Sequence, residues 1–234
     1  MSRTQYIIAG ASPDLISPVS PAQCILWLRS DVGVVHGGTT WEDQSDLQGT
    51  ALAVSQTWSV YPNQLNGHPG VGTSMMGIYR ANWAAPYLNG GTTAFTIYGV
   101  WKTNGPPNNG IYANKANPGR PGIWTYRDFQ NAKPIWIKRV DDDNTAKIVT
   151  TNGLGSQSYG SDIWRCNGTT IDAWHAGIRH QTGADFSGIS QSSMDQLVIT
   201  SWNIHVEWKI WSGALSDEEI TNLIEYSTDR YGAI

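Results

Sequence analysis

The residues best placed for acid–base chemistry are a histidine and a glutamate near the end of the chain. His205 and Glu207 are two positions apart in an alternating segment, and alternate residues of a β-strand share one face. Such a pair can exchange protons with a substrate, but a surface salt bridge uses the same two residue types. Gly-x-Ser-x-Gly, His-Glu-x-x-His and Walker-type motifs are absent. We therefore favour the salt bridge, expect no enzymatic activity and assign no catalytic residue.

One acidic run could bind a metal ion. Asp141, Asp142, Asp143 and Asn144 carry oxygen ligands of the kind that Ca²⁺ takes. The run lies between two expected strands, and a hairpin needs Asp and Asn as turn residues in any case. We prefer the turn and assign no metal site and no cofactor, with weak Ca²⁺ binding as the alternative.

Aromatic residues suggest that the chain binds carbohydrate. It contains 12 Trp and 10 Tyr but only 3 Phe, and Trp and Tyr are the aromatic residues suited to half-wet positions. A sugar site wants an exposed ring beside polar side chains. The candidate carbohydrate-binding residues are Trp124, Tyr126, Trp136, Trp174 and His175. The alternative is that these rings fill the core or an oligomer interface, where Trp and Tyr are also enriched.

Charge and hydropathy exclude several classes of partner. The net charge is −4 and no run of Lys or Arg occurs, so we expect no nucleic-acid partner. We also expect no membrane insertion, and the apolar stretch at 6–9 is too short for the core of a secretory signal. Cys24 and Cys166 could form one bridge, but without a secretory signal we favour two free thiols.

The first 22 residues are predicted to form an extended arm. Pro13, Pro18 and Pro21 disfavour a helix or a central strand. Tyr6, Ile7 and Ile8 could pair with the edge of a sheet through main-chain hydrogen bonds. Because the arm has little apolar surface of its own, we expect it to anchor the chain to a partner protein.

The last quarter of the chain carries the clearest structural pattern. Apolar and polar residues alternate over 202–210, which predicts a strand buried on one face only. Ser216 lies three residues before Glu219 in a capping box, so a helix is expected to begin at Asp217. Its apolar stripe is narrow, and we expect it to pack on the rim of a sheet.

The region 23–234 is expected to form one all-β domain. Predicted strands cover 25–29, 58–61, 93–102, 122–126, 135–140, 146–150, 171–178 and 197–201. Asn-Gly, Pro-Gly and Gly-Gly pairs separate many of them, and such spacing is typical of a two-sheet antiparallel jelly-roll sandwich. We expect turns at Asn66-Gly67 and Asn167-Gly168, and we expect the Asp43 and Ser45 side chains to bond neighbouring backbone amides. With one short C-terminal helix, this gives two parts: the arm 1–22 and the sandwich 23–234.

Several short motifs in this region resemble one known superfamily. They are Leu26-Trp27-Leu28 with Asp31, Trp41-x-Asp43-Gln44-Ser45, Asn66-Gly67-x-Pro69-x-Val71, residues 95–100, residues 207–219 and the closing Asp-Arg-Tyr-Gly at 229–232. Together they resemble the concanavalin A-like lectin/glucanase superfamily, and more narrowly the laminin-G-like jelly rolls of bacterial surface proteins and bacteriophage virions. The resemblance implies two stacked antiparallel sheets, with the C-terminal strand returning beside the first.

The resemblance also suggests a function. It implies a non-enzymatic virion-surface protein, a capsid decoration or fibre module, with other virion proteins as partners of the arm. Such a protein would be homo-oligomeric and could bind host-surface glycans. A soluble, extracellular carbohydrate-binding protein is the alternative. A glycoside hydrolase is less favoured, because glycosidases of this fold carry a Glu-x-Asp-x-x-Glu run that the sequence lacks.

Overall fold

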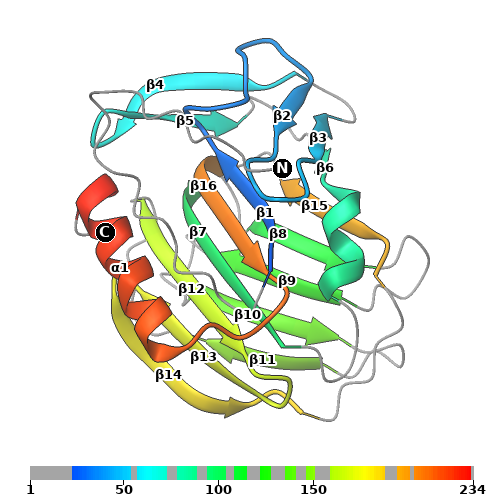
Figure 1. Ribbon diagram of the computed structural model, residues 1–234, viewed down its shortest axis with the longest axis vertical. Coiled ribbons are helices and arrows are strands. Elements are labelled where there is room, and N and C mark those ends of the chain that lie inside the picture. Colours follow the sequence, from blue (N-terminus) through cyan, green and yellow to red (C-terminus); the bar gives the residue numbers. More distant parts are fainter. Residues whose placement is uncertain are drawn as a thin grey trace, which may run out of the picture.

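The computed structural model shows two antiparallel β-sheets stacked face to face, with one α-helix outside them (Figure 1). It describes residues 23–53, 57–72, 78–88, 94–103, 108–114, 122–127, 135–140, 146–150, 159–187, 194–200 and 203–232. The predicted arm with Tyr6, Ile7 and Ile8, and the acidic run 141–144, lie outside these residues. The all-β sandwich predicted from the sequence is confirmed.

The first sheet contains the strand on which the helix rests. Its order is β14-β13-β12-β7-β16-β5-β4, and β1 also pairs with β16. The bounds are β1 Cys24–Arg29, β4 Ser59–Leu65, β5 His68–Gly72, β7 Phe95–Thr103, β12 Gly160–Cys166, β13 Thr170–His175, β14 Ile178–Asp185 and β16 Asn203–Trp211. The pairing of β1 with β16 confirms that the last strand returns beside the first.

The second sheet lies behind the first. Its order is β11-β10-β9-β8-β15-β6-β3-β2. The bounds are β2 Thr40–Glu42, β3 Thr50–Ala53, β6 Ile78–Arg80, β8 Asn108–Asn114, β9 Gly122–Arg127, β10 Ile135–Val140, β11 Ala146–Thr150 and β15 Gln196–Thr200. A short 3₁₀ helix, η1 (Asn82–Leu88), follows β6 and packs near β15.

Large aromatic side chains fill the space between the sheets. Trp41 and Trp58 meet edge to face with ring centroids 5.2 Å apart, an arrangement that aromatic pairs prefer. Trp101, Trp164 and Trp208 are fully buried in the same cluster. Much of the tryptophan surplus therefore belongs to the core.

Strand β16 is buried on both faces, so the prediction of one solvent-exposed face is wrong. Trp208 and Ile210 face the core between the sheets, whereas Val206 and Trp211 belong to a second apolar cluster outside the first sheet. Even Glu207 is fully buried. The alternating pattern identified the strand but not the element that covers its polar face.

That element is helix α1 (Asp217–Tyr231), which begins at the predicted residue. The Ser216 hydroxyl accepts from the Glu219 N–H at 3.2 Å, and the Glu219 carboxylate accepts from the Ser216 N–H at 2.7 Å. The sequence analysis predicted that this helix packs on the rim of a sheet, and that prediction is wrong. Its buried residues Ile220 and Leu223 instead join the cluster on the outer face of the first sheet (Figure 1).

Several local predictions are confirmed. Asn66 and Gly67 both have positive φ, 45° and 82°, in the turn between β4 and β5. Asn167 caps the β12–β13 turn by accepting from the N–H of Thr170 at 2.9 Å. Cys24 and Cys166 are free thiols.

Among the described helices, none is long and apolar enough to span a membrane.

Candidate functional site

His205 and Glu207 do not form the pair that their spacing predicts. The register between β16 and β7 shifts between these two residues, and this β-bulge breaks the alternation of faces. The His205 ring lies in the core, stacked 6.5 Å from Trp101, and its Nδ1 accepts a hydrogen bond from the Trp208 indole at 2.9 Å. Glu207 lies on the side of helix α1. Both residues are fully buried. The prediction that they form a surface salt bridge is therefore also wrong.

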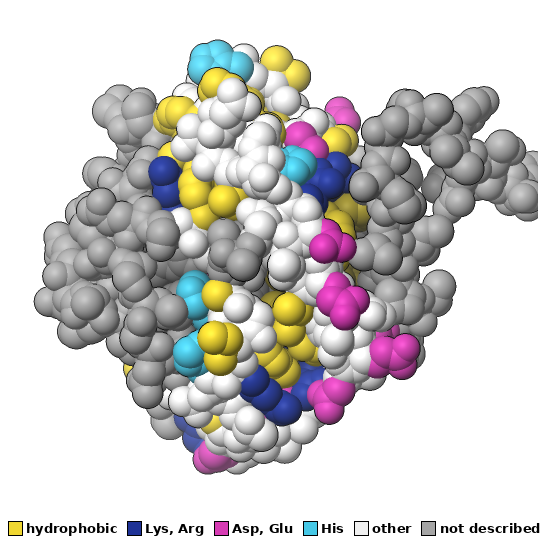
Figure 2. Space-filling view, turned by 90° about the vertical axis from the view of Figure 1, so that its left-hand side faces the viewer, with side chains coloured by type: hydrophobic (Ala, Val, Ile, Leu, Met, Phe, Trp, Pro, Cys, Tyr) yellow, Lys and Arg dark blue, Asp and Glu magenta, His cyan; other side chains and the backbone are white. Residues whose placement is uncertain are grey.

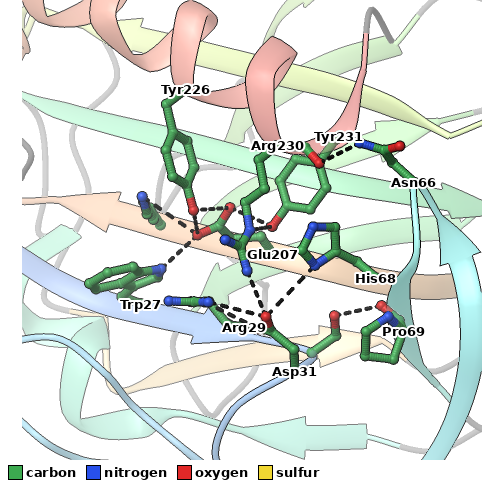
Figure 3. A network of polar contacts seen from close by, with 12 residues as sticks. Trp27, Arg29, Asp31, Asn66, His68, Pro69, Glu207, Tyr226, Arg230 and Tyr231 are labelled. Atoms are coloured by element: carbon green, nitrogen blue, oxygen red, sulfur yellow. Dashed lines mark hydrogen bonds and ion pairs between the residues drawn. The ribbon is translucent and has the colours of Figure 1, made fainter. Parts of the chain in front are cut away.

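The Glu207 carboxylate is held by three neutral donors (Figure 3) and by the Lys209 ammonium group, whose Nζ lies 3.5 Å from Glu207 Oε1. The Trp27 indole donates to it at 2.7 Å, the Tyr231 hydroxyl at 2.8 Å and the Tyr226 hydroxyl at 2.9 Å. Burial, and then the nearby Glu207 charge, raise the pKa of both tyrosines well above the usual value, so both remain donors. This arrangement satisfies a buried carboxylate and leaves little freedom for proton transfer to a substrate.

A second ionic group lies beside this network and joins the end of the helix to the first strand (Figure 3). Asp31 accepts from Arg29 at 3.1 Å and from Arg230 at 2.6 Å. Burial acts against the ionised form, but the two guanidinium groups still lower the pKa of Asp31. Asn66 donates to the Arg230 carbonyl at 2.9 Å. These contacts fasten the C-terminal end of α1 to the sandwich.

Trp174, a predicted sugar platform, lies between two arginines. The Arg165 and Arg179 guanidinium carbons lie 5.2 and 5.0 Å from the ring centroid, and only 6% of the residue is exposed. On the face that lies to the left in Figure 1, hydrophobic side chains gather between acidic and histidine side chains (Figure 2). A sugar could stack on Trp174 only after an arginine moved, so its sugar-binding role stays a prediction.

His175, the neighbouring candidate, is held by a buried carboxylate. Its Nδ1 lies 2.6 Å from Asp162 Oδ1, and the Trp101 indole donates to Asp162 Oδ2 at 2.7 Å. The His180 ring lies 6.4 Å away between centroids. Asp162 was not singled out in the sequence, although its Cα pairs with that of His175 across β12 and β13. These contacts fix the orientation of the His175 ring, and its role in sugar binding stays a prediction.

The three remaining aromatic candidates occupy adjacent strands of the second sheet. Tyr126 pairs with Trp136 across β9 and β10, and Trp124 pairs with Lys138 two positions along. Paired positions lie on the same face of an antiparallel sheet, so the backbone brings the predicted positions together. Their side chains lie outside the described part of the chain, and their role in sugar binding stays a prediction.

The structure adds a site that the sequence analysis did not identify. An open cleft of about 400 Å³ lies at the edge of the second sheet, which is within the usual range of ligand pockets, roughly 300–1,000 Å³. Strands β2 and β3 and the loop between them form its walls. It is lined by Glu42, Asp43, Gln44, Gln48, Gly49 and Thr50.

The Asp43 side chain organises the loop from inside. Its Oδ1 accepts from the N–H groups of Trp27 at 2.7 Å and Ser45 at 2.9 Å. Its Oδ2 accepts from the Ser45 hydroxyl at 2.5 Å and from the Gly49 N–H at 3.3 Å. Asp43 is 5% exposed. This confirms the turn-forming role expected for Asp43 and Ser45 and leaves Asp43 without an open position for a ligand.

Gly49 closes the loop where two segments meet. A Cβ atom at this position would overlap the ring of Trp83 in η1, so only glycine allows this close approach. The Gly49 carbonyl accepts from the Asp43 N–H at 3.0 Å. The floor of the cleft is therefore fixed by packing as well as by hydrogen bonds.

The side chains around this floor are polar and accessible. Glu42, Gln48 and Thr50 are exposed, and Gln44 is half-buried. The Gln44 amide nitrogen donates to the Glu42 carbonyl at 3.1 Å, and the amide carries a second N–H donor and an acceptor oxygen. Carboxylate, amide and hydroxyl groups on a rigid loop can bind a polar ligand without any chemical step.

Comparisons with known proteins show what the fold resembles. No protein-family model matches the sequence, and no characterised protein matches it significantly. A Trypanosoma rangeli sialidase mutant with trans-sialidase activity superposes with a TM-score of 0.62 at 13% identity. The match covers 91% of this chain but 34% of that one, so the chain spans about a third of the sialidase.

Two further domains have similar TM-scores. The binding domain of botulinum neurotoxin DC, solved with SialylT, gives a TM-score of 0.62 at 14% identity over 87% of this chain and 51% of its own. Domain 4 of AbnA, a Geobacillus stearothermophilus arabinanase, was solved with arabinotriose. It gives 0.61 at 11% identity over 87% of this chain and 98% of its own. At these identities the likeness shows the fold alone, a two-sheet β-sandwich.

Proposed function

We propose that this chain is a non-catalytic carbohydrate-binding module and that the cleft beside β2 and β3 binds the sugar. The observation that supports this most directly is a rigid, open polar cleft on a sandwich of this kind. One similar structure is a domain solved with arabinotriose, and the match covers 98% of that domain. The residues that line the cleft include no aromatic ring, so the proposed contacts to the sugar are polar ones, and they need no acid–base geometry.

The positions of the titratable residues support a non-catalytic role over a glycoside hydrolase. Glu207 accepts three hydrogen bonds from buried donors, and His205 is enclosed by Trp101 and Trp208. A general acid must reach the glycosidic oxygen, and neither residue can do so where it lies. We propose that the purified chain releases no reducing ends from polysaccharides.

A glycan array with the purified full-length chain tests the binding proposal. We expect selected glycans to be retained, and we expect the double variant Gln48→Ala, Thr50→Ala to lose them while it keeps the thermal transition of the parent. As a control, Glu218→Gln changes an exposed side chain on helix α1 and should bind as the parent does. Complete silence of the parent protein on the array would overturn the proposal.

We also propose a virion-surface location, which rests on the sequence. The proline-rich stretch 1–22 precedes the first strand of the sandwich, and Tyr6, Ile7 and Ile8 could add to the edge of a partner's sheet. In this proposal the arm anchors the module to other virion proteins, and a homo-oligomer displays it toward host-surface glycans. A freely acting extracellular lectin is the alternative.

Deleting residues 2–22 distinguishes these two locations. The virion proposal expects the truncated chain to fold and to keep glycan binding, but to lose assembly onto purified phage particles that lack the protein. Unchanged assembly would overturn the anchoring role of the arm. Sedimentation of both forms would show whether the oligomer also depends on the arm.

A further inference from the structure

We infer that the cleft selects uncharged, hydroxyl-rich saccharides and rejects acidic ones. The inference rests on the proposed carbohydrate-binding function and concerns which sugars the cleft can hold. It follows from an unequal supply of hydrogen-bond donors and acceptors on the loop 42–50. Most backbone N–H groups of the loop are already bonded within the protein, whereas the Glu42 carboxylate is an exposed acceptor.

The backbone donors of the loop point inward. The N–H groups of Glu42, Asp43 and Gln44 donate to the carbonyls of Gly33, Gly49 and Trp27 at 2.9, 3.0 and 2.7 Å. Farther along, the N–H groups of Ser45, Leu47, Gln48 and Gly49 donate to the Asp43 carboxylate, the Ser45 hydroxyl and the Ser45 carbonyl. Between Glu42 and Gly49, the N–H group of Asp46 is the one that makes none of these hydrogen bonds.

This use of the backbone removes the usual means of binding an anion. Anion sites in loops rely on several N–H groups that converge on the ligand. The residues that line the cleft include no Lys, Arg or His to replace them. A carboxylate of an acidic sugar would therefore meet few donors here.

The accessible side chains offer acceptors instead. The Glu42 carboxylate is acceptor-only when ionised, and it is exposed. The exposed Gln48 amide can donate or accept. Gln44 donates one of its two amide N–H groups to the Glu42 carbonyl, and its amide oxygen can accept from a ligand. Sugar hydroxyls can donate to these acceptors, and the Thr50 hydroxyl can either donate or accept.

The charge of the cleft acts in the same direction. Glu42 and the buried Asp43 carboxylate both line it, and like charges held close together repel. A saccharide with a uronic or sialic acid at this position would bring a third negative charge. An uncharged saccharide has no such penalty and supplies the missing donors.

The test uses glycans in matched pairs that differ only in a terminal acidic sugar, such as lactose-based glycans with and without sialic acid. On an array, and then by calorimetry with the strongest pair, we expect the uncharged member to bind at least about tenfold tighter, the loss typical of an unmatched charged group. Glu42→Gln keeps the shape of the side chain and removes its charge. The variant should therefore bind the uncharged glycan only about threefold tighter than the acidic one, or less. Glu218→Gln is the control and should leave the preference unchanged.

The outcomes separate this inference from the proposed function. If no glycan of either kind binds, the proposed function fails. If the acidic members bind as tightly as their uncharged partners, the proposed function stands and the inference is overturned. If Glu42→Gln changes the preference no more than Glu218→Gln does, the cleft is not the selecting site, and the inference is also overturned.

Discussion

The Tyr226 hydroxyl in helix α1 lies 2.9 Å from Oε1 and 3.1 Å from Oε2 of Glu207 in strand β16. This contact joins the only α-helix in the described residues to a buried strand of the first sheet. The Trp27 indole of β1 reaches the same carboxylate. Three elements thus meet at one buried charge, and its removal should affect all three.

We expect Glu207→Gln to destabilise the protein by about 2–4 kcal/mol, because a buried group loses charged hydrogen bonds and gains an unmatched donor. Urea unfolding followed by tryptophan fluorescence measures the change. Glu218→Gln alters an exposed glutamate and should stay within about 0.5 kcal/mol of the parent. Equal unfolding midpoints for the two variants would contradict a stabilising role for Glu207.

Asp43→Ala should destabilise the protein by about 2–4 kcal/mol, because it leaves several inward-pointing donors without an acceptor. It should also abolish glycan binding by releasing the loop. Asp46→Ala changes an exposed residue of the same loop and should alter stability by less than about 0.5 kcal/mol. Thermal unfolding and the glycan array give the two readouts. A stable Asp43→Ala variant would show that the loop does not depend on this carboxylate.

Stability should decrease in acid partly through Asp172. Burial acts against its ionised form, but hydrogen bonds from Arg165 and Arg179 lower its pKa below the ordinary 3.8. The unfolded chain therefore takes up this proton more readily, so the stabilisation is present above about pH 4 and is lost as the pH falls through the folded-state pKa. Asp172→Asn should lower the Tm at pH 7 and flatten its fall below pH 4.

The control for this pH series is Asp195→Asn, which changes an exposed aspartate. Its Tm should stay within about 1–2 °C of the parent Tm at every pH between 2 and 7. This range corresponds to the change of about 0.5 kcal/mol that is usual for surface substitutions. If Asp172→Asn also follows the parent throughout, the two arginines do not stabilise the ionised carboxylate.

Both thiols should be unreactive in the folded protein. Burial raises the pKa of the Cys24 thiol to about 12, although Lys209 acts in the opposite direction, and Cys166 is fully buried. Because the thiolate is the reactive form, Ellman's reagent at pH 8 should label neither residue before unfolding and both in urea. Fast labelling of the native protein, or fewer than two thiols in urea, would contradict this.

Amide hydrogen exchange should show which strands are the most strongly protected. The amides of β16 are hydrogen-bonded to β7 and β1 and are covered on both faces, so they should exchange among the slowest, through global unfolding. If the arm anchors the module to a partner, residues 1–22 should exchange fast in the isolated protein. Slow exchange in the arm of a monomer would remove the physical reason for the anchoring proposal.

Local signals in the sequence predicted local structure well. The capping box placed the first residue of helix α1 because all its hydrogen bonds lie within four residues. The Asn66-Gly67 and Asn167-Gly168 turns were predicted for the same reason. The strands β2, β3 and β6 were missed, because three or four residues are too few to show an alternating pattern. The longer strands β5, β8, β12 and β14 were missed as well.

Long-range contacts explain the errors on β16. The alternation of polar and apolar residues predicted an exposed face, but donors from Trp27 and Tyr231 satisfy Glu207 across large sequence distances. The bulge after His205 also changed the face on which the histidine lies. Neither the covering helix nor the bulge leaves a signal within the strand itself.

The cleft was missed because its framework was interpreted only as a turn. Asp43 and Ser45 were correctly expected to bond backbone amides. Of the residues that line the cleft, Glu42 and Thr50 belong to no motif, Gln44 belongs to one that was used only for the fold, and the pairing of β2 with β3 brings them together. A useful signal was the density of polar residues around an aspartate whose own side chain is needed for the turn.

This division of labour in the loop 42–50 has an evolutionary consequence. The inward side chain of Asp43 and the close approach at Gly49 hold the backbone. Glu42, Gln44, Gln48 and Thr50 line the cleft, and of these four side chains Gln44 holds the loop by one hydrogen bond, to the Glu42 carbonyl. Mutations at these four positions can therefore accumulate under selection with little cost in folding. A lineage facing a changing host surface, or a laboratory library randomised at these codons, could explore new ligands while the scaffold stays intact.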